Sequence, residues 1–173
     1  MELKTANIND LEKIISFYKY AIENTPTMKD YGRWIYGLHP TDEMIEGYIK
    51  ENTMYYVEDN GIITLCVGLA PYQGDDYHDI NWSKDLSDDE VYTVHILCVN
   101  PDFQGKGLAR NAMAYVIEKA KQEGKKAVRF DALDCNKPAN TLYQSMGFTK
   151  TDCRNLYAAN TGYIDFNFYE MNI

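Results

Sequence analysis

The chain has 173 residues, of which 45% are hydrophobic and 25% charged, a composition typical of a single globular domain with its own core. Its net charge of −9 excludes a typical nucleic-acid-binding protein, because binding phosphates requires a basic face, whereas it would attract a cationic substrate. The sequence contains no apolar run long enough to span a membrane and no signal peptide core, so we expect a cytoplasmic protein without a membrane partner.

The residue pattern in the first half of the chain predicts helices and a hairpin of two strands. The helices show apolar residues at three- and four-residue spacing behind a polar capping residue. Asn60-Gly61 favours a tight turn between the hairpin strands, and residues 70–90 are polar enough to form a long loop that could line a site. The predicted elements are a strand at 2–6, a helix capped by Asn9 or Asp10 and closed by Thr25-Pro26, a short helix or ordered loop at Met28–Leu38, a helix opening at His39–Glu43, and strands at Met54–Val57 and Ile62–Leu69.

The second half predicts the alternation of strands and helices typical of an α/β domain. A helix with apolar residues from Leu108 to Ala120 ends at Gly124. The sequence has no internal repeat or linker, so we expect one α/β domain over residues 1–173. The predicted elements are strands at Val91–Val99, Ala127–Leu133, Phe148–Tyr157 and Tyr163–Asn172, with helices at Leu108–Ala120 and Pro138–Met146.

The four cysteines do not form a pattern typical of a metal site or of a disulfide framework. None belongs to a C-x-x-C pair, and no histidine stands at metal-ligand spacing from them. Three lie in predicted strands or strand ends, where a reduced cysteine behaves as a small hydrophobic residue. We therefore expect neither a metal nor a disulfide at Cys66, Cys98, Cys135 and Cys153.

A glycine-rich segment follows the predicted strand Val91–Val99 and opens the next helix. It contains Phe103-Gln104-Gly105-Lys106-Gly107-Leu108-Ala109-Arg110. Glycines let backbone N–H groups approach a ligand, and the start of a helix adds free hydrogen-bond donors and positive partial charge. The segment therefore favours binding of a phosphate, and the positive charges of Lys106 and Arg110 can add to this attraction. A dinucleotide fingerprint needs a third glycine where Arg110 stands, and the spacing of a Walker loop is absent. Taken alone, the segment could also be a turn that binds nothing.

Two motifs together resemble the GNAT superfamily of N-acetyltransferases. The pattern Gln104-x-x-Gly107-x-Ala109, behind a strand that ends Leu97-Cys98-Val99-Asn100-Pro101, resembles its motif A. At the expected separation, Asn136-x-x-Ala139-x-x-Leu142-Tyr143-x-x-x-Gly147-Phe148 resembles its motif B. The resemblance covers most of the chain and is specific over residues 91–148. A fainter resemblance to one bacterial subgroup comes from Trp34, Pro40-Thr41, Tyr77, Trp82 and His95.

The resemblance implies a mixed, mostly antiparallel sheet flanked by helices, with two central strands that splay apart to admit the pantetheine arm of acetyl-CoA. Here those strands would be Val91–Val99 and Ala127–Leu133. The backbone of Leu97, Cys98 and Val99 would bind the pantetheine as an added strand does. Asn136 and Asn140 would contact it from the other side. The pyrophosphate would be held by Gln104, Gly105, Lys106, Gly107, Leu108, Ala109 and Arg110.

The reaction that the resemblance implies is acetyl transfer to an amine. Amines are mostly protonated at neutral pH, so a proton must be removed before the nitrogen attacks the thioester. Tyr143 would be the general acid near the coenzyme sulfur, unless it only packs its helix on the sheet. His95 could accept the substrate's proton, unless it is a locally bonded strand histidine, and Glu90 is a rival base. Backbone N–H groups around Val99 would stabilise the oxyanion.

The acceptor is predicted to be a small-molecule amine. A protein N-terminus or lysine side chain as acceptor, and a non-catalytic module that senses acyl-CoA, are the alternatives. His39 and His78 are expected to be exposed. Edge pairing of the apolar strand Tyr163–Ile173 would give a homodimer. Loop aromatic residues could form the acceptor pocket or only cover the end of the sheet, namely Trp34, Tyr72, Tyr77 and Trp82.

Overall fold

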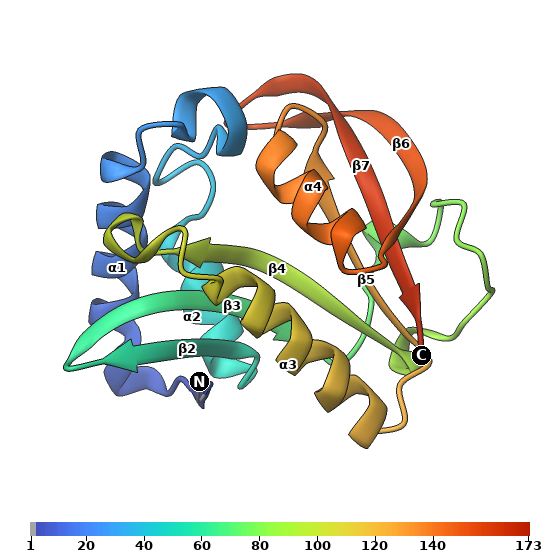
Figure 1. The fold of residues 1–173 in the computed structure, drawn as a ribbon, viewed down its shortest axis with the longest axis horizontal. Coiled ribbons are helices and arrows are strands. Elements are labelled where there is room, and N and C mark those ends of the chain that lie inside the picture. The colour runs from blue at the N-terminus through green and yellow to red at the C-terminus, as the bar shows by residue number, and fades with distance from the viewer. Residues whose placement is uncertain (1–2) are drawn as a thin grey trace.

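Residues 3–173, the part of the chain that the computed structural model describes, form seven strands and four α-helices (Figure 1). The strands form one sheet in which a single neighbouring pair, β4 with β5, runs parallel. The sheet has the order β1-β2-β3-β4-β5-β7-β6. The strands are β1 (Lys4–Thr5), β2 (Met54–Asp59), β3 (Ile62–Ala70), β4 (Val91–Val99), β5 (Ala127–Leu133), β6 (Thr149–Ala158) and β7 (Gly162–Asn172). The helices are α1 (Leu11–Asn24), α2 (Asp42–Lys50), α3 (Leu108–Gln122) and α4 (Lys137–Ser145).

The predicted elements are present, and the differences lie at their ends. The strand predicted at 2–6 is observed as Lys4–Thr5, and residue 2 lies outside the described residues. Of the two predicted helix caps, Asn9 and Asp10, it is Asp10 that stands at the N-cap position of α1. A short helical turn precedes α1, and the side chain of Asn7 caps that turn by accepting from the Asn9 amide at 3.0 Å. Asp10 makes no side-chain capping bond to α1.

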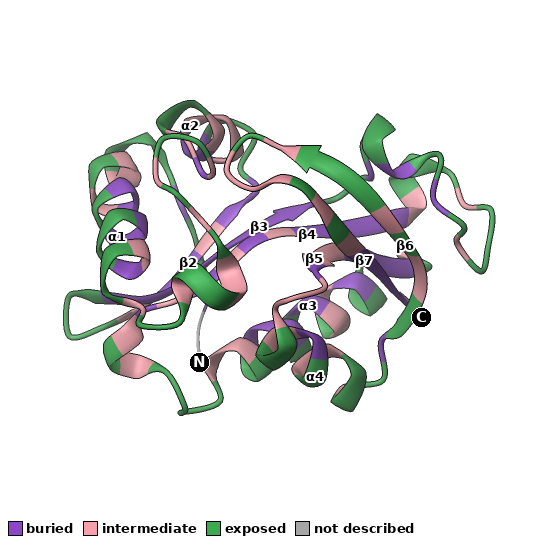
Figure 2. Cartoon of the chain, turned by 90° about the horizontal axis from the view of Figure 1, so that it is seen from above, coloured by how far each residue is buried: buried purple, intermediate pink, exposed green. Residues whose placement is uncertain are grey.

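Helices cover both faces of the sheet (Figure 2). On one face, α1 and α2 bury Ile14 and Ile45 against β2 to β4. On the other face, α3 and α4 pack around Met113 and Phe130. Burying a side chain of this size stabilises the fold by about 1.5–3 kcal/mol, so the two apolar layers hold the sheet between them. Within residues 3–173, none of the helices has the length and apolar composition needed to cross a membrane.

The two central strands separate along their length. Residues Val91–Thr93 of β4 pair with Ala127–Arg129 of β5, and no pair follows beyond these three in the described structure. β5 nevertheless pairs with β7 along its whole length. Inside β4, Ile96 has a φ of +41°, which is unusual for a β-branched residue, and the Tyr18 hydroxyl of α1 donates to its carbonyl at 2.8 Å. A gap therefore opens inside the sheet, as predicted for the splayed strands.

The C-terminal strand is not an edge of the sheet. β7 lies between β5 and β6 and is hydrogen-bonded to both. The predicted homodimer through an edge of Tyr163–Ile173 is therefore wrong, because the backbone groups of this strand are already used. The edge on this side of the sheet is β6.

Candidate active site

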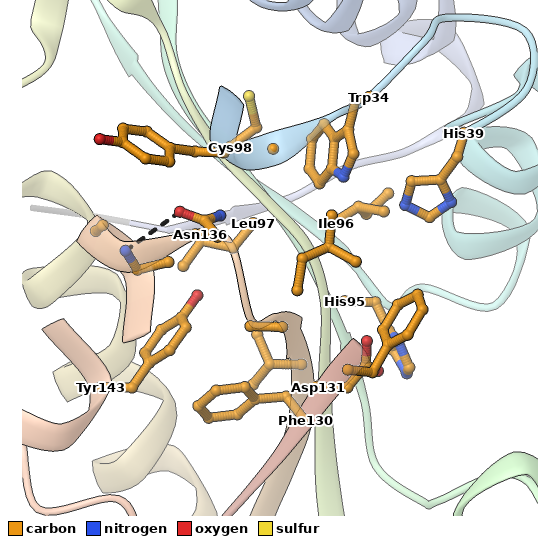
Figure 3. A pocket seen from close by; sticks show the side chains of 18 of the residues that line it. Trp34, His39, His95, Ile96, Leu97, Cys98, Phe130, Asp131, Asn136 and Tyr143 are labelled. Atoms are coloured by element: carbon orange, nitrogen blue, oxygen red, sulfur yellow. Dashed lines mark hydrogen bonds between the residues drawn. The ribbon is translucent and has the colours of Figure 1, made fainter. Parts of the chain in front are cut away.

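A cavity of about 1280 Å³ occupies the gap between β4 and β5 (Figure 3). Its lining residues come from β4, β5, the start of α3, α4, the segments 25–39 and 75–80, and the end of β6. This volume exceeds the usual range of about 300–1,000 Å³ for ligand pockets, so the cavity has room for a large ligand and a second, smaller one.

The glycine-rich segment forms one end of the cavity. Gly105 and Gly107 have φ angles of +75° and +77°, and a Cβ added at either would meet no atom within 4 Å. Glycine is therefore required there for its conformational freedom and not for space. Gly107 caps α3, whose first-turn amides have no partner inside the helix, and Leu108, Ala109 and Arg110 line the cavity. The donors and the positive end of the helix suit a diphosphate.

The basic side chains of this segment differ in position. Arg110 donates to the Ser145 hydroxyl of α4 at 2.6 Å, so it joins the two helices beside the cavity. Lys106 does not line the cavity: its ammonium group lies 4.6 Å from the centroid of the Phe103 ring. Gln104 lines the cavity and its amide is 3.4 Å from the Thr25 hydroxyl. Lys106 therefore offers an exposed positive charge near the cavity and no contact within its lining.

The middle of the cavity has on one wall the part of β4 that pairs with β3 but no longer with β5. Leu97, Cys98 and Val99 of β4 line it at the level where β5 has separated, so their backbone can bind an extended ligand as an added strand. On the opposite side, Asn136 caps α4 by accepting from the Ala139 amide at 3.3 Å, which leaves its NH₂ group without a protein acceptor among the described residues.

Asn140 has a structural position and does not line the cavity. It is buried, its NH₂ group donates to the carbonyls of Leu133 and Asn136 at 2.9 and 2.8 Å, and its oxygen accepts from the Tyr169 hydroxyl at 2.7 Å. The predicted contact of Asn140 with the coenzyme is therefore corrected: this side chain fastens α4 to the sheet.

Tyr143 of α4 directs its hydroxyl into the cavity (Figure 3). Its ring packs on Phe130 with a centroid distance of 4.4 Å, and none of the described residues hydrogen-bonds to the hydroxyl. Burial raises the pKa of Tyr143, and the negative charge of Asp131 and the neighbouring Tyr169 add to the effect. The hydroxyl is therefore protonated at neutral pH and able to donate.

His95 of β4 also lines the cavity. Its Nε2 lies 3.1 Å from the Thr93 hydroxyl, and its ring stacks on Tyr48 with a centroid distance of 5.7 Å. Burial lowers the pKa of His95, and the charges of Asp131 and Asp76 oppose this effect. A neutral imidazole can accept a proton. The two alternatives for His95 were a locally bonded strand histidine and a proton acceptor in the site. In the structure its side chain is locally bonded and also lines the cavity.

Glu90 lies outside the cavity. Its carboxylate pairs with Lys126 and accepts from the Ser87 amide at 3.1 Å, and the Lys126 hydrogen bond lowers its pKa. An acid that is already paired and remote from the cavity cannot take a proton from the substrate. The alternative of Glu90 as base is therefore wrong.

The loop aromatic residues divide into two groups. Trp34 and Tyr77 line the cavity, whereas Tyr72 and Trp82 do not. His39 also lines it, with its ring 5.5 Å from that of Trp34, so the prediction that His39 is exposed is wrong. His78 is exposed as predicted, and its Nε2 lies 2.9 Å from Asp88.

A buried ion pair fastens the long loop of residues 70–90 to the sheet. The side chains of Arg129 in β5 and Glu170 in β7 are each 1% exposed and lie 2.7 Å apart. Arg129 also donates to the loop at Gln73 and at the Lys84 carbonyl, both at 2.7 Å, and its guanidinium lies 4.5 Å from the centroid of the Trp82 ring. Sequence patterns did not reveal this pair, although charged residues inside predicted strands were a signal that could have found it.

Asp131 is the second residue that the sequence patterns missed. It lies two positions after Arg129 in β5, lines the cavity, and accepts a hydrogen bond from the Tyr77 hydroxyl at 2.7 Å. Among residues 3–173, no group of three or more histidine, cysteine or acidic side chains could hold a metal ion. The site thus consists of an end formed by the start of α3 and suited to an anion, a strand gap, and a chamber with uncharged and acidic groups, an arrangement suited to acyl transfer from a phosphate-bearing coenzyme.

Comparison with known families agrees with this class of protein. A family model described as the acetyltransferase (GNAT) family matches residues 9–148. The chain belongs to this family. Its members use acetyl-CoA as the acyl donor and act on amine-type acceptors, which is the chemistry that motifs A and B predicted.

Curated relatives show similar chemistry with different acceptors. L-Methionine sulfoximine/L-methionine sulfone acetyltransferase of Salmonella typhimurium is 29% identical over 156 residues, which are 87% of this chain and 81% of that protein. L-Amino acid N-acyltransferase MnaT of Escherichia coli is 31% identical over 94 residues, 54% of this chain and 48% of that protein. The match to an N-acetyltransferase of Methanocaldococcus jannaschii spans only 33% of that protein, at 32% identity over 43% of this chain.

Solved structures confirm the predicted GNAT fold. An acetyltransferase structure from Staphylococcus aureus Mu50 superposes with a TM-score of 0.71 at 25% identity, covering 99% of both chains. A Salmonella typhimurium acetyltransferase solved with acetyl-CoA gives a TM-score of 0.69 at 19% identity, covering 99% of this chain and 93% of that one.

Proposed function

We propose that this protein transfers the acetyl group of acetyl-CoA to the primary amine of a small molecule, by direct attack in a ternary complex. The observation that carries the proposal is that one cavity contains both the anion-binding end at α3 and, beyond Tyr143, a chamber large enough for an acceptor. We call this part of the cavity the acceptor chamber; it is lined by Trp34, Tyr48, Tyr77, His95, Asp131 and Phe168. Holding both substrates in one cavity supplies much of the rate by proximity.

The proposed chemistry requires the movement of two protons. The amine nitrogen attacks the carbonyl carbon of the thioester, the bond from that carbon to sulfur breaks, and an amide and free CoA result. An acceptor that enters as an ammonium ion loses two protons: one ends on the CoA sulfur and the other leaves to solvent. The protonated Tyr143 hydroxyl is suited to supply the first, and the neutral His95 to take the second. Backbone N–H groups around Val99 would stabilise the oxyanion.

A small acceptor fits the chamber better than a protein segment does. The segments 25–39 and 75–80 and the end of β6 line the cavity that contains it. The relatives named for methionine sulfone and for L-amino acids act on small amino compounds. Another relative, 32% identical over 42% of this chain, is named [ribosomal protein bS18]-alanine N-acetyltransferase, after a protein acceptor. A peptide with an N-terminal alanine is therefore a suitable protein-type acceptor for comparison.

The test is release of free thiol from acetyl-CoA over a panel of amines. The panel contains L-methionine sulfone, L-methionine sulfoximine, 2-phenylethylamine and a peptide with an N-terminal alanine. We expect turnover with at least one small amine and none with the peptide. Binding of CoA without turnover on any amine would support a sensor module, and turnover confined to the peptide would support a protein acceptor.

A further inference from the structure

A half-buried carboxylate, Asp131, lies in the acceptor chamber and has no part in the proposed proton transfers. Figure 3 places Asp131 beside His95, with Tyr143 across the cavity. The residue comes from β5, on the opposite side of the strand gap from His95 in β4. A charged group in this position needs a reason, because removing a carboxylate from water is costly unless it has a partner.

The orientation of the carboxylate is fixed by Tyr77. The Tyr77 hydroxyl donates to Oδ1 of Asp131 at 2.7 Å. Tyr77 is itself buried and stacked on Trp82 at a centroid distance of 5.7 Å, and the Trp82 indole donates to the Tyr77 carbonyl at 2.8 Å. None of the described residues donates to the other oxygen, Oδ2, which leaves it available to a ligand.

No cation of the described chain compensates the charge of Asp131. It forms no ion pair with a lysine, arginine or histidine side chain. Of the two arginines in the cavity wall, Arg110 lies at the coenzyme end, and Arg154 is bonded to Asp152 at 2.8 Å. A cationic ligand is the natural partner for such a carboxylate.

The walls around Asp131 are aromatic. Tyr77 meets Phe168 edge-to-face with a centroid distance of 6.0 Å, and His95 stacks on Tyr48. Trp34 lines the same chamber. Aromatic faces hold an apolar substituent and also attract a cation that lies over them.

We propose that Asp131 binds the ammonium group of the acceptor through Oδ2, and that the acceptor is a primary amine with an apolar or aromatic substituent. This inference rests on the proposed function, since it names the substrate class for the same site. Asp131 holds the nitrogen beside His95, one proton passes from the nitrogen to the imidazole and on to solvent, and the freed lone pair attacks the thioester.

The experiment compares two ligands of nearly equal shape on two variants. Protein saturated with CoA is titrated in a calorimeter with 2-phenylethylamine and with 2-phenylethanol, which lacks the charge. Asp131→Asn keeps an oxygen for the Tyr77 hydroxyl but removes the charge, and Tyr77→Phe keeps the charge but removes the hydroxyl. Melting temperature and affinity for CoA verify that each variant is folded.

We expect the wild-type protein to bind the amine about 10- to 100-fold more tightly than the alcohol, as charged hydrogen bonds allow. Asp131→Asn should abolish this preference, and Tyr77→Phe should retain most of it. The inference would be overturned if Asp131→Asn bound the amine as tightly as the wild type, or if the amine did not bind at all. An equal loss of affinity in both variants would also overturn it, because Asp131 would then only anchor Tyr77.

Thiol release from acetyl-CoA, measured on the same protein variants without added CoA, separates this inference from the proposed function. Amine binding that depends on Asp131 but gives no thiol release with any amine of the panel would support the inference and contradict the proposed function. Equal thiol release by the wild type and Asp131→Asn would support the function and overturn the inference.

Discussion

Tyr143 and His95 lie on different walls of the cavity, and burial shifts the pKa of each toward its uncharged form. The phenol therefore keeps a proton that it can donate, and the imidazole lacks one that it can accept. Both states follow from the same cause, the loss of water around a group that would otherwise be charged. The cavity thus holds a protonated phenol and a neutral imidazole at the same pH.

Replacing Tyr143 with Phe tests the acid. We expect turnover to fall by about 10²–10⁴-fold, the usual contribution of general acid–base catalysis, with little change in affinity for CoA. Thiol release across the pH range measures it. Tyr115→Phe, at an exposed tyrosine on α3, is the matched control. Unchanged turnover in Tyr143→Phe at every pH would contradict the assignment.

Replacing His95 with Gln tests the base through the pH profile. Because burial lowers the pKa of His95, the neutral form should persist below the ordinary value of about 6.5, and the acidic limb of kcat/KM should lie below that pH. In His95→Gln we expect lower activity and loss of this limb. Exposed His78, whose pKa is raised by Asp88, gives the control His78→Gln. A retained limb in His95→Gln would show that another group titrates.

At the scale of elements, the start of α3 forms the end of the cavity that we propose for the coenzyme. The segment turns into the helix through two glycines with positive φ, and the positive end of a helix of 15 residues then faces the cavity. On the acceptor side, the buried pair of Arg129 and Glu170 fastens the long loop to the sheet. One side of the site is therefore set by local backbone conformation and the other by a contact between distant strands.

Gly107→Ala separates conformation from space at the start of α3. Because the site is open but φ is +77°, we expect a loss of roughly 1–2 kcal/mol from backbone strain and weaker binding of CoA. Thermal denaturation and calorimetry measure the two effects. Gly47→Ala in α2 is the control, since Gly47 also has open space but an ordinary helical backbone, and the change should stabilise by about 0.5–1 kcal/mol. Equal effects in both variants would refute the conformational argument.

At the scale of the whole molecule, the proposed coenzyme site joins elements that the sheet leaves apart. The cavity is lined by β4, β5, α3 and α4, and β4 and β5 pair over only three residues. A ligand that binds the folded state across this gap should therefore stabilise the whole fold.

We expect acetyl-CoA at about 100 times its Kd to stabilise the fold by about 2.7 kcal/mol, which is roughly 5–10 °C in Tm for a domain of this size. Differential scanning calorimetry measures the shift. Adenosine, which lacks the diphosphate and the pantetheine, is the control ligand, and Arg110→Glu should reduce the shift. Absence of any shift with acetyl-CoA and with CoA would contradict the proposed coenzyme site.

Much of this protein was predictable from its sequence. The strands and helices follow from apolar periodicity, and the positions of Gly107 and Tyr143 follow from motifs of a few residues, because these features depend on neighbours along the chain. The sequence leaves Asn9 and Asp10 open as caps because several polar residues in a row could each cap a turn; Asp10 stands at the cap of α1, and Asn7 caps the short turn before it.

The tertiary structure decided what depends on residues far apart in the sequence. The hydrogen bond from Tyr77 to Asp131 joins positions 54 residues apart, and no local pattern indicates it. The burial of Asn140 and His39 depends on how α4 and the segment 25–39 pack, and the place of β7 inside the sheet depends on strand order. Periodicity determines which side chains share a face of an element, but the neighbours of that face are determined only when the chain folds.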